Sequence, residues 1–248
     1  MKEGIFLNKV VLKNISKAYY NQLGKLDVIN DLSLEVKEGE IVAVVGPSGT
    51  GKSTILNLIS KLDTVDFGEI VIDGKVGYMF QHDLLFEWQS VLKNVLTGVE
   101  IKRKITKEDK EKALRLLEKY ELLDFSSSYP KELSGGMRQR VALIRTLMIN
   151  PDILLLDEPF SALDAQTRIN VSNDVYKTIK EEKLTAILVT HDISEAISLA
   201  DRIIILSKRP AKVKKEYKLE FNNLTPITKR TTPLFSYYFD KIWNDISD

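Results

Sequence analysis

The chain has 248 residues, of which 44% are hydrophobic and 29% are charged. This balance is typical of a globular protein and excludes a disordered or fibrous chain, and the formal net charge of +1 provides no overall field that would recruit nucleic acid or an anionic membrane. The sequence contains no cysteine, which excludes disulfides and thiolate metal sites.

The first part of the chain predicts a β layer followed by a buried strand. Residues 1–6 show no signal-peptide pattern, so we expect a cytoplasmic protein that reaches a membrane only through a partner. Strand-like segments at 10–12 and 32–36, separated by a polar turn with Gly24, indicate antiparallel pairing. Residues 40–45 are mostly β-branched and lead into a glycine, which suits a strand buried on both faces of a parallel sheet.

The middle of the chain, at residues 88–133, is charged and helical in pattern. Thr106 and Asp109 form a capping pair for a helix, and apolar residues recur after them at helical spacing. We interpret this stretch as a helical subdomain inserted into an α/β core. Beyond it, helices alternate with strands, which predicts a parallel sheet. The helices are expected at 136–149 and 169–181, and the strands at 153–156 and 185–189.

The end of the chain, after residue 208, has weaker periodicity. Alternating apolar residues predict one more half-exposed strand, and residues 234–246 favour a short helix. A cluster of basic residues could contact lipid headgroups, but a solvated strand face is the favoured interpretation. The basic cluster consists of Lys208, Arg209, Lys212, Lys214 and Lys215.

A glycine-rich loop joins the strand at 40–45 to a predicted helix at 53–60. It matches the pattern G-x-x-x-x-G-K-[ST], in which glycines free backbone N–H groups to point at phosphate oxygens. Lys52 is expected to reach the β- and γ-phosphates of ATP, and Ser53 to offer its hydroxyl to Mg²⁺. The flanking strand and helix disfavour a chance match. The loop residues are Gly46, Pro47, Ser48, Gly49, Thr50, Gly51, Lys52, Ser53 and Thr54.

Two carboxylates follow the apolar strand at 153–156, at the sheet edge where ligands of open α/β sheets bind. Asp157 is expected to hold the Mg²⁺ shell, and Glu158 to act on the attacking water as general base. Without other motifs, two acidic residues at the end of a strand more often lie in a solvated turn. Their combination with the phosphate loop favours a catalytic role.

The motif at 133–140, Leu-Ser-Gly-Gly-Met-Arg-Gln-Arg, resembles the signature of ATP-binding-cassette (ABC) proteins and lies between the two phosphate-site motifs, as in that family. A serine N-cap followed by two glycines is also an ordinary helix start. The resemblance implies that two such domains pack head to tail. Ser134, Gly135 and Gly136 of one copy would then face the γ-phosphate bound by the other.

The resemblance assigns roles to further positions. Tyr19 matches the aromatic residue that stacks on adenine, with Tyr20 as the second choice and a core aromatic as the plain alternative. Gln81 resembles the glutamine that touches Mg²⁺ and the attacking water. Asp164 belongs to the segment 161–164, which is similar to the family's dimer-interface loop, and His191 matches the histidine that senses the γ-phosphate.

The implied fold is α/β, with a P-loop NTPase (RecA-like) core, a mainly parallel sheet, an N-terminal antiparallel β layer and an inserted helical subdomain. We expect one ABC ATPase domain over 5–248. Its core would span about 5–87 and 136–208, its helical subdomain about 88–135 and its tail 209–248.

Finer details resemble the ATPase subunits of nitrate, sulfonate and taurine importers. Met137 replaces the glutamine common elsewhere in the family, and Trp88 follows the glutamine loop as in that group. Glu87 stands where those subunits have proline, at the surface that receives the permease, and 144–147 reads Ile-Arg-Thr-Leu in place of Ala-Arg-Ala-Leu. The tail also lacks the group's proline- and arginine-rich ending.

The resemblance implies an assembly on the cytoplasmic face of the cell membrane. It would contain two copies of this chain, transmembrane permease subunits and an extracytoplasmic solute-binding protein, with no nucleic acid. The ATPase of an exporter or lipoprotein-release complex is the alternative, since it shares every catalytic residue. A DNA-maintenance ABC protein would need long coiled coils, a ribosome-binding factor normally has two cassettes, and a small-molecule kinase has no use for the signature.

Overall fold

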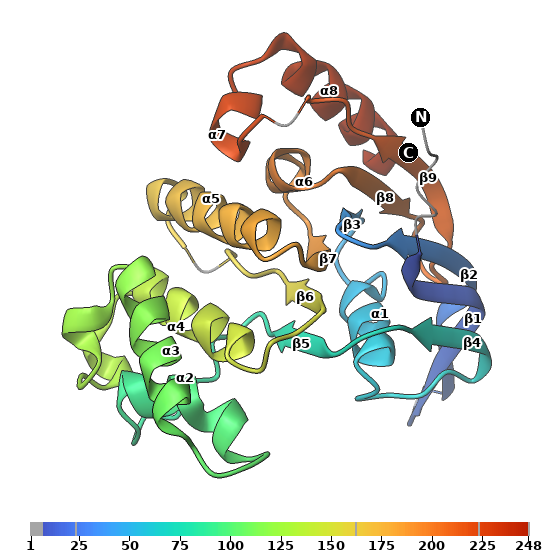
Figure 1. The fold of residues 1–248 in the computed structure, drawn as a ribbon. Helices are drawn as coiled ribbons and strands as arrows, with labels where there is room; N and C mark the ends of the chain where they lie inside the picture. Colours follow the sequence, from blue (N-terminus) through green and yellow to red (C-terminus); the bar gives the residue numbers. More distant parts are fainter. Residues whose placement is uncertain (1–6, 23, 162, 223, 248) are drawn as a thin grey trace.

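A six-stranded sheet runs through the middle of the molecule (Figure 1). In the computed structural model, which describes residues 7–22, 24–161, 163–222 and 224–247, its order is β5-β6-β7-β3-β8-β9, and only β8 and β9 pair antiparallel. Every residue of β3, β6 and β7 is buried because other layers cover both faces of these inner strands. The strands are β3 (Ile41–Val45), β5 (Val76–Met79), β6 (Ile153–Asp157), β7 (Thr185–Thr190), β8 (Arg202–Leu206) and β9 (Val213–Lys218).

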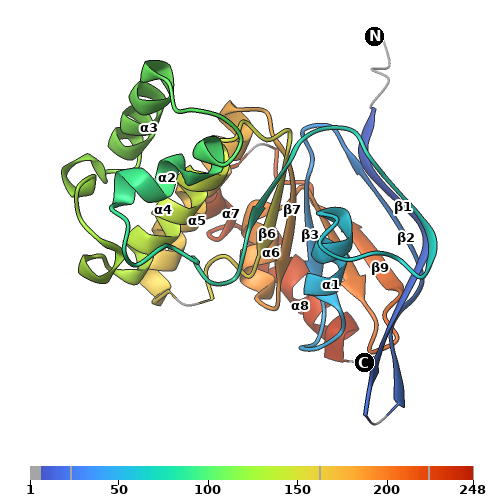
Figure 2. The same cartoon turned by 90° about the horizontal axis from the view of Figure 1, so that it is seen from below.

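A second, antiparallel sheet forms a separate layer on one side of the molecule. It contains β1 (Asn8–Asn21), which pairs with both β2 (Gly24–Lys37) and β4 (Phe67–Ile72). Figure 2 shows helix α1 (Lys52–Ile59) between this layer and the central sheet. The alternating buried residues of β2 explain the arrangement, since one face packs on the core and the other meets solvent.

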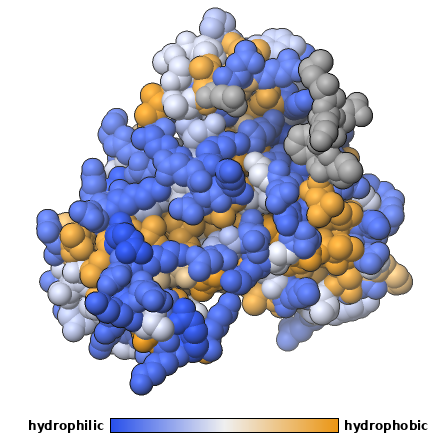
Figure 3. Space-filling model, in the orientation of Figure 1, coloured by the Kyte–Doolittle hydropathy of each residue, from blue (hydrophilic) through white to orange (hydrophobic). Residues whose placement is uncertain are grey.

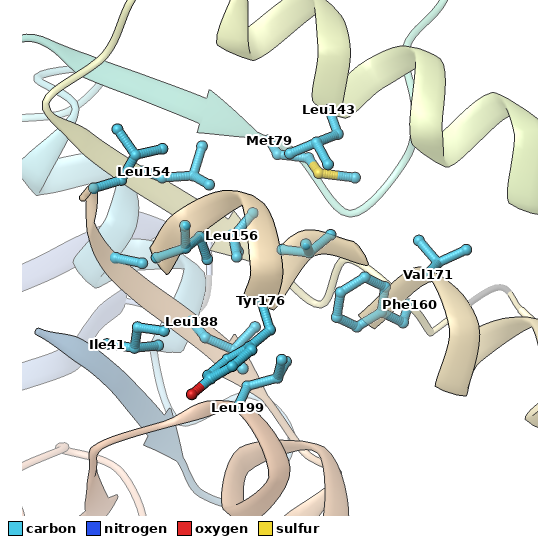
Figure 4. Packing of buried hydrophobic residues seen from close by; sticks show 14 of the residues in the cluster. Ile41, Met79, Leu143, Leu154, Leu156, Phe160, Val171, Tyr176, Leu188 and Leu199 are labelled. Carbon is cyan, nitrogen blue, oxygen red and sulfur yellow. The ribbon is translucent and has the colours of Figure 1, made fainter. Parts of the chain in front are cut away.

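The central sheet separates two hydrophobic cores, because successive residues of a strand point to opposite faces. Val42 and Val44 of β3 pack with α1 and the antiparallel layer. Ile41, with Leu156 and Leu188 on neighbouring strands, packs instead with the helices on the other face. Figure 4 shows Leu188 and Ile41 on the side of Tyr176 and Leu199, and Phe160 beside Val171 in the same core. The phosphate loop and the signature helix are therefore anchored in different cores.

Helices cover the second face of the sheet, and α2, α3 and α4 gather at one end (Figure 1). The predicted capping box at Thr106 and Asp109 is present at the start of α3. Helix α4 packs on α2 and α3 but also on α5 and β5, so it joins this group to the sheet. The helices are α2 (Val91–Glu100), α3 (Lys107–Lys119), η1 (Leu123–Phe125), η2 (Pro130–Glu132), α4 (Gly135–Leu147), α5 (Ala165–Glu181), α6 (Ile193–Leu199), α7 (Pro226–Lys229) and α8 (Pro233–Ser247).

The predicted α/β fold, with its parallel sheet and antiparallel layer, is confirmed. Strands β4, β5 and β8 were not among the expected elements, and the helix expected at 169–181 begins at Ala165 because Asp164 caps it. The tail forms the strand β9 and the helix α8 as expected. The division into core, inserted subdomain and tail stays a prediction.

The surface is mostly hydrophilic over the helices in Figure 3, with an apolar patch on the side of the antiparallel layer. Leu26, Phe67 and Val71 are exposed apolar residues of this layer. No helix in the part of the chain that the structure describes is long and apolar enough to cross a bilayer.

The two glycines that open α4 differ in their surroundings, and this gives a stability prediction. A Cβ on Gly136 would lie 2.4 Å from Cγ2 of Thr167, whereas one on Gly135 would lie 3.7 Å from Cδ2 of Leu163, an ordinary contact. We expect Gly136→Ala to lower the free energy of unfolding by about 1–3 kcal/mol. Gly135→Ala should change it by less than about 1 kcal/mol. Urea denaturation without nucleotide measures both, and equal effects would contradict the assigned contact.

Candidate active site

The phosphate loop connects β3 to α1 with glycines in backbone conformations that other residues avoid. Gly49 and Gly51 have φ angles of +75° and +103°, and a Cβ on Gly51 would lie 2.6 Å from Cγ1 of Val28. Gly51 caps α1 without a side-chain hydrogen bond, so the free N–H groups of this helix start remain available to an anion.

Lys52, the first residue of α1, is buried beside the loop. Its Nζ donates hydrogen bonds to the carbonyl oxygens of Gly46 at 2.9 Å and Pro47 at 3.1 Å. Burial lowers the pKa of this ammonium, while the nearby carboxylates of Glu158 and Asp157 oppose that shift. Carbonyl oxygens of the loop thus hold the lysine side chain beside it.

Ser53 and Asp157 meet across the start of α1 and the end of β6. The Ser53 hydroxyl donates to Oδ1 of Asp157 at 3.0 Å, and the hydroxyl of Tyr78 donates to Oδ2 at 3.2 Å. Burial raises the pKa of Asp157, and these two hydrogen bonds act against the shift. Tyr78 was missed by the sequence analysis because its strand, β5, was missed.

The oxygen donors of this corner fit Mg²⁺. That ion usually takes one or two carboxylates together with waters and substrate phosphate oxygens. The hydroxyl of Ser53 and the carboxylate of Asp157 are such ligands and are adjacent. Among the described residues, no group of three or more His, Cys, Asp or Glu side chains could hold a metal ion.

Glu158, one residue beyond β6, contacts both of the other predicted catalytic residues. Its Oε2 lies 3.0 Å from Nδ1 of His191 and accepts a hydrogen bond from Nε2 of Gln81 at 3.4 Å. The backbone of Glu158 has a φ of +44°, a left-handed conformation that a non-glycine residue adopts at a cost. Its N–H donates to the carbonyl oxygen of Val189 at 2.8 Å, which fixes the turn that presents the carboxylate.

Residues of the phosphate loop and Glu158 line the same cavity, which has a volume of about 360 Å³. Its lining includes Tyr19, Ser48, Lys52, Ser53, Thr54 and Glu158. A larger cavity, of about 460 Å³, is lined by Tyr20 and contains none of the predicted catalytic residues. The smaller cavity is our candidate nucleotide site, because residues of the phosphate loop and Glu158 line it.

Tyr19 is better placed for a nucleotide than Tyr20, since only Tyr19 lines that cavity. Its hydroxyl donates to Oδ2 of Asp63 at 2.6 Å, and Nζ of Lys17 lies 5.2 Å from the centre of its ring. These contacts hold the ring at the cavity wall, and 38% of the residue remains exposed. The aromatic surface is thus available for stacking.

The signature residues stand apart from the cavity within one chain. The Ser134 hydroxyl caps α4 by accepting a hydrogen bond from N of Met137 at 3.3 Å. Ser134 and Gly135 are exposed, whereas Gly136 is buried. Asp164 caps α5 through the backbone N–H groups of Gln166 and Thr167, and Ala162 of the predicted interface loop lies outside the described residues. An exposed helix start that is remote from its own phosphate loop is available to a second copy.

The segment after Gln81 is fastened to the signature helix by Arg138. Its guanidinium donates to Asp83 at 2.8 Å through Nε and to Glu87 at 2.7 Å through Nη2. Burial opposes the charged form of Asp83, but the hydrogen bonds from Arg138 hold the pKa of that carboxyl below its usual value. Trp88, next to Glu87, is 73% exposed. Glu87 thus provides an ion pair between this segment and α4.

Comparison with known proteins shows close similarity over most of the chain. The ABC transporter family model matches residues 29–161. The aliphatic sulfonates import ATP-binding protein SsuB of Bacillus anthracis is 39% identical, with 94% of each chain covered. The taurine import ATP-binding protein TauB of Roseobacter denitrificans is 42% identical, with 80% of this chain and 77% of that protein covered.

A solved structure shares the fold. It is the dimeric structure of a post-hydrolysis state of the ATP-binding cassette MJ0796 bound to ADP and Pi. It superposes with a TM-score of 0.76 at 36% identity and covers 85% of this chain and 99% of that one.

The geometry around Glu158 predicts the effect of removing its charge. Glu158→Gln keeps the shape of the side chain but cannot accept a proton from water, so we expect ATP hydrolysis to fall at least ~100-fold. ATP binding should persist, because Lys52 and the loop are untouched. Phosphate release and nucleotide titration measure the two effects. Wild-type turnover in this variant would contradict the role of Glu158, and Lys52→Ala, which should lose nucleotide binding, is the control.

Proposed function

The chain belongs to the ABC transporter family as an ATP-binding and ATP-hydrolysing subunit, and we propose that it drives the uptake of a small sulfonate-like solute. The relatives reported above are named for aliphatic sulfonate and taurine import, and taurine is itself a sulfonate. These relatives favour an importer over an exporter or a lipoprotein-release complex. The subunit provides the energy, and the permease selects the solute.

The observation that carries the chemistry is the Glu158 carboxylate, placed beside the phosphate loop with His191 and Gln81 on one of its oxygens. Lys52 and the loop N–H groups hold the triphosphate. Glu158 takes a proton from the attacking water, whose oxygen bonds to the γ-phosphorus while the bond to the ADP oxygen breaks. His191 and Gln81 keep the carboxylate in position. Ser53 and Asp157, together with the Gln81 side chain that the family resemblance implies, would hold Mg²⁺, which would neutralise phosphate charge.

The complete site requires a second copy of the chain. Ser134 and Gly135 are exposed at the start of α4 and do not line the cavity of their own chain, so their N–H groups are free to bind a γ-phosphate held by another copy. The similar cassette was solved as a dimer. ATP would then join the two copies, and hydrolysis would release them.

The permease surface is the segment that carries Trp88. This exposed tryptophan packs against Phe86, with ring centroids 5.0 Å apart, and the segment is braced by Arg138. An exposed aromatic residue on a rigid support is a typical anchor for a partner. In the assembly, the permease would hold this chain at the cytoplasmic face of the membrane, and an extracytoplasmic solute-binding protein would deliver the solute.

Mixing two inactive variants tests the composite site. Lys52→Ala disables the phosphate loop, and Ser134→Arg disables the signature. A mixed dimer contains one intact site, formed by the loop of the Ser134→Arg chain and the signature of the Lys52→Ala chain. We therefore expect the mixture to regain ATPase activity that neither variant has alone. If both variants are folded and their mixture is as inactive as each variant alone, the proposal that two copies form each site is contradicted.

The cysteine-free sequence makes the permease contact directly testable. A single cysteine in Trp88→Cys, labelled with a photoactivated crosslinker, should form an adduct with the permease in membranes that contain the assembled transporter. Ile101→Cys is a matched control. It is 79% exposed, close to the value for Trp88, but lies at the other end of α2, roughly 15 Å away along the helix. Equal adducts from both positions, or none from either, would contradict the proposed surface.

A further inference from the structure

The turn between β8 and β9 brings Arg209 to the phosphate loop. A Cβ placed on Gly49 would lie 3.4 Å from Nη2 and 3.9 Å from Cζ of Arg209. The arginine also lines the 360 Å³ cavity together with Lys52 and Glu158. It comes from a part of the chain more than a hundred residues beyond the loop, and no motif in the sequence pointed to it.

Hydrogen bonds on both sides of Arg209 fix the backbone of this turn. The N–H of Ser207 donates to the carbonyl oxygen of Lys212 at 2.9 Å, and the Ser207 hydroxyl accepts from N of Lys212 at 3.0 Å. Ala211 pairs with β2, donating to the carbonyl oxygen of Val28 at 2.8 Å and accepting from N of Asn30 at 3.1 Å. Because Val28 faces Gly51 of the loop, the turn and the loop are held against the same strand.

The guanidinium of Arg209 has no carboxylate partner among the residues that the structure describes, in contrast to other basic side chains nearby. Lys215 forms an ion pair with Asp245 of α8, and Arg202 forms ion pairs with Glu40 and Glu216. The basic cluster expected from the sequence is therefore divided. Lys215 serves the packing of the tail, and Arg209 faces the cavity.

We propose that Arg209 binds the phosphates of the nucleotide, as a second cation beside Lys52. A guanidinium can donate two parallel hydrogen bonds to phosphate oxygens and stays charged at any working pH. The position next to Gly49 puts it at the phosphate portion of the cavity, and the anchored turn reduces the ordering cost of binding. The proposal rests on the nucleotide site described above.

Isothermal titration with the non-hydrolysable analogue AMPPNP tests the proposal. Arg209→Ala should bind it roughly tenfold more weakly than the wild type, as expected for the loss of a charge-assisted hydrogen bond. Arg209→Lys should fall between the two. Lys208→Ala removes the neighbouring exposed cation of the same turn, which does not line the cavity, and should match the wild type. Arg209 is exposed, so thermal unfolding of these variants should be unchanged.

Tripolyphosphate, which has no base or ribose, identifies the group that Arg209 contacts. An equal loss of affinity for tripolyphosphate and AMPPNP in Arg209→Ala supports a phosphate contact. A loss limited to AMPPNP would mean that the arginine contacts the adenosine, and would overturn the proposal. An unchanged AMPPNP affinity in Arg209→Ala would also overturn it while leaving the nucleotide site intact. Absence of AMPPNP binding by the wild type would instead contradict the site itself.

Discussion

The in-register ends of three parallel strands determine the position of the proposed catalytic residues. Val45 pairs with Thr190, and Asp157 pairs with Val189. The residues that follow these strands, Gly46, Glu158 and His191, therefore leave the sheet at one edge. Parallel pairing sends all carboxyl ends the same way, so a shift in the register of β6 would separate Glu158 from His191 and from the loop. The rest of the site depends on this alignment.

Two packing environments meet at that edge. The phosphate loop is supported by β2 through Val28, on the side of the antiparallel layer. Phe160, two residues after Glu158, is buried in the core of the helical side. A nucleotide that contacts both the loop and Glu158 thus bridges two cores that the central sheet otherwise separates. Bound ATP would therefore touch residues that are anchored in both cores.

The sequence predicts those parts of the site that local motifs encode. Asp157 ends a buried apolar strand, Glu158 and His191 follow such strands, and Ser53 belongs to the glycine-rich loop motif. The structure brings Ser53 to Asp157 and His191 to Glu158. Tyr78 was missed because β5 is a short edge strand of Val-Gly-Tyr-Met, too short for a clear period. The position of Arg209 depends on the pairing of Ala211 with Val28 and Asn30, a contact between distant segments that no local pattern reports. A strand of four residues and a turn positioned by a distant strand therefore leave no local pattern from which they can be predicted.

Glu87 has a structural consequence for the contact between its segment and α4. A proline at this position would offer no charge to Arg138, whereas Glu87 accepts a hydrogen bond from it. Arg138 lies in the first turns of α4, the helix whose start we assign to the partner's γ-phosphate, and it also holds Asp83, two residues after Gln81. One guanidinium therefore connects the signature helix, the segment that carries Gln81, and the support of Trp88. In the proposed dimer, these ion pairs would connect a movement of α4 to the segment that carries Trp88.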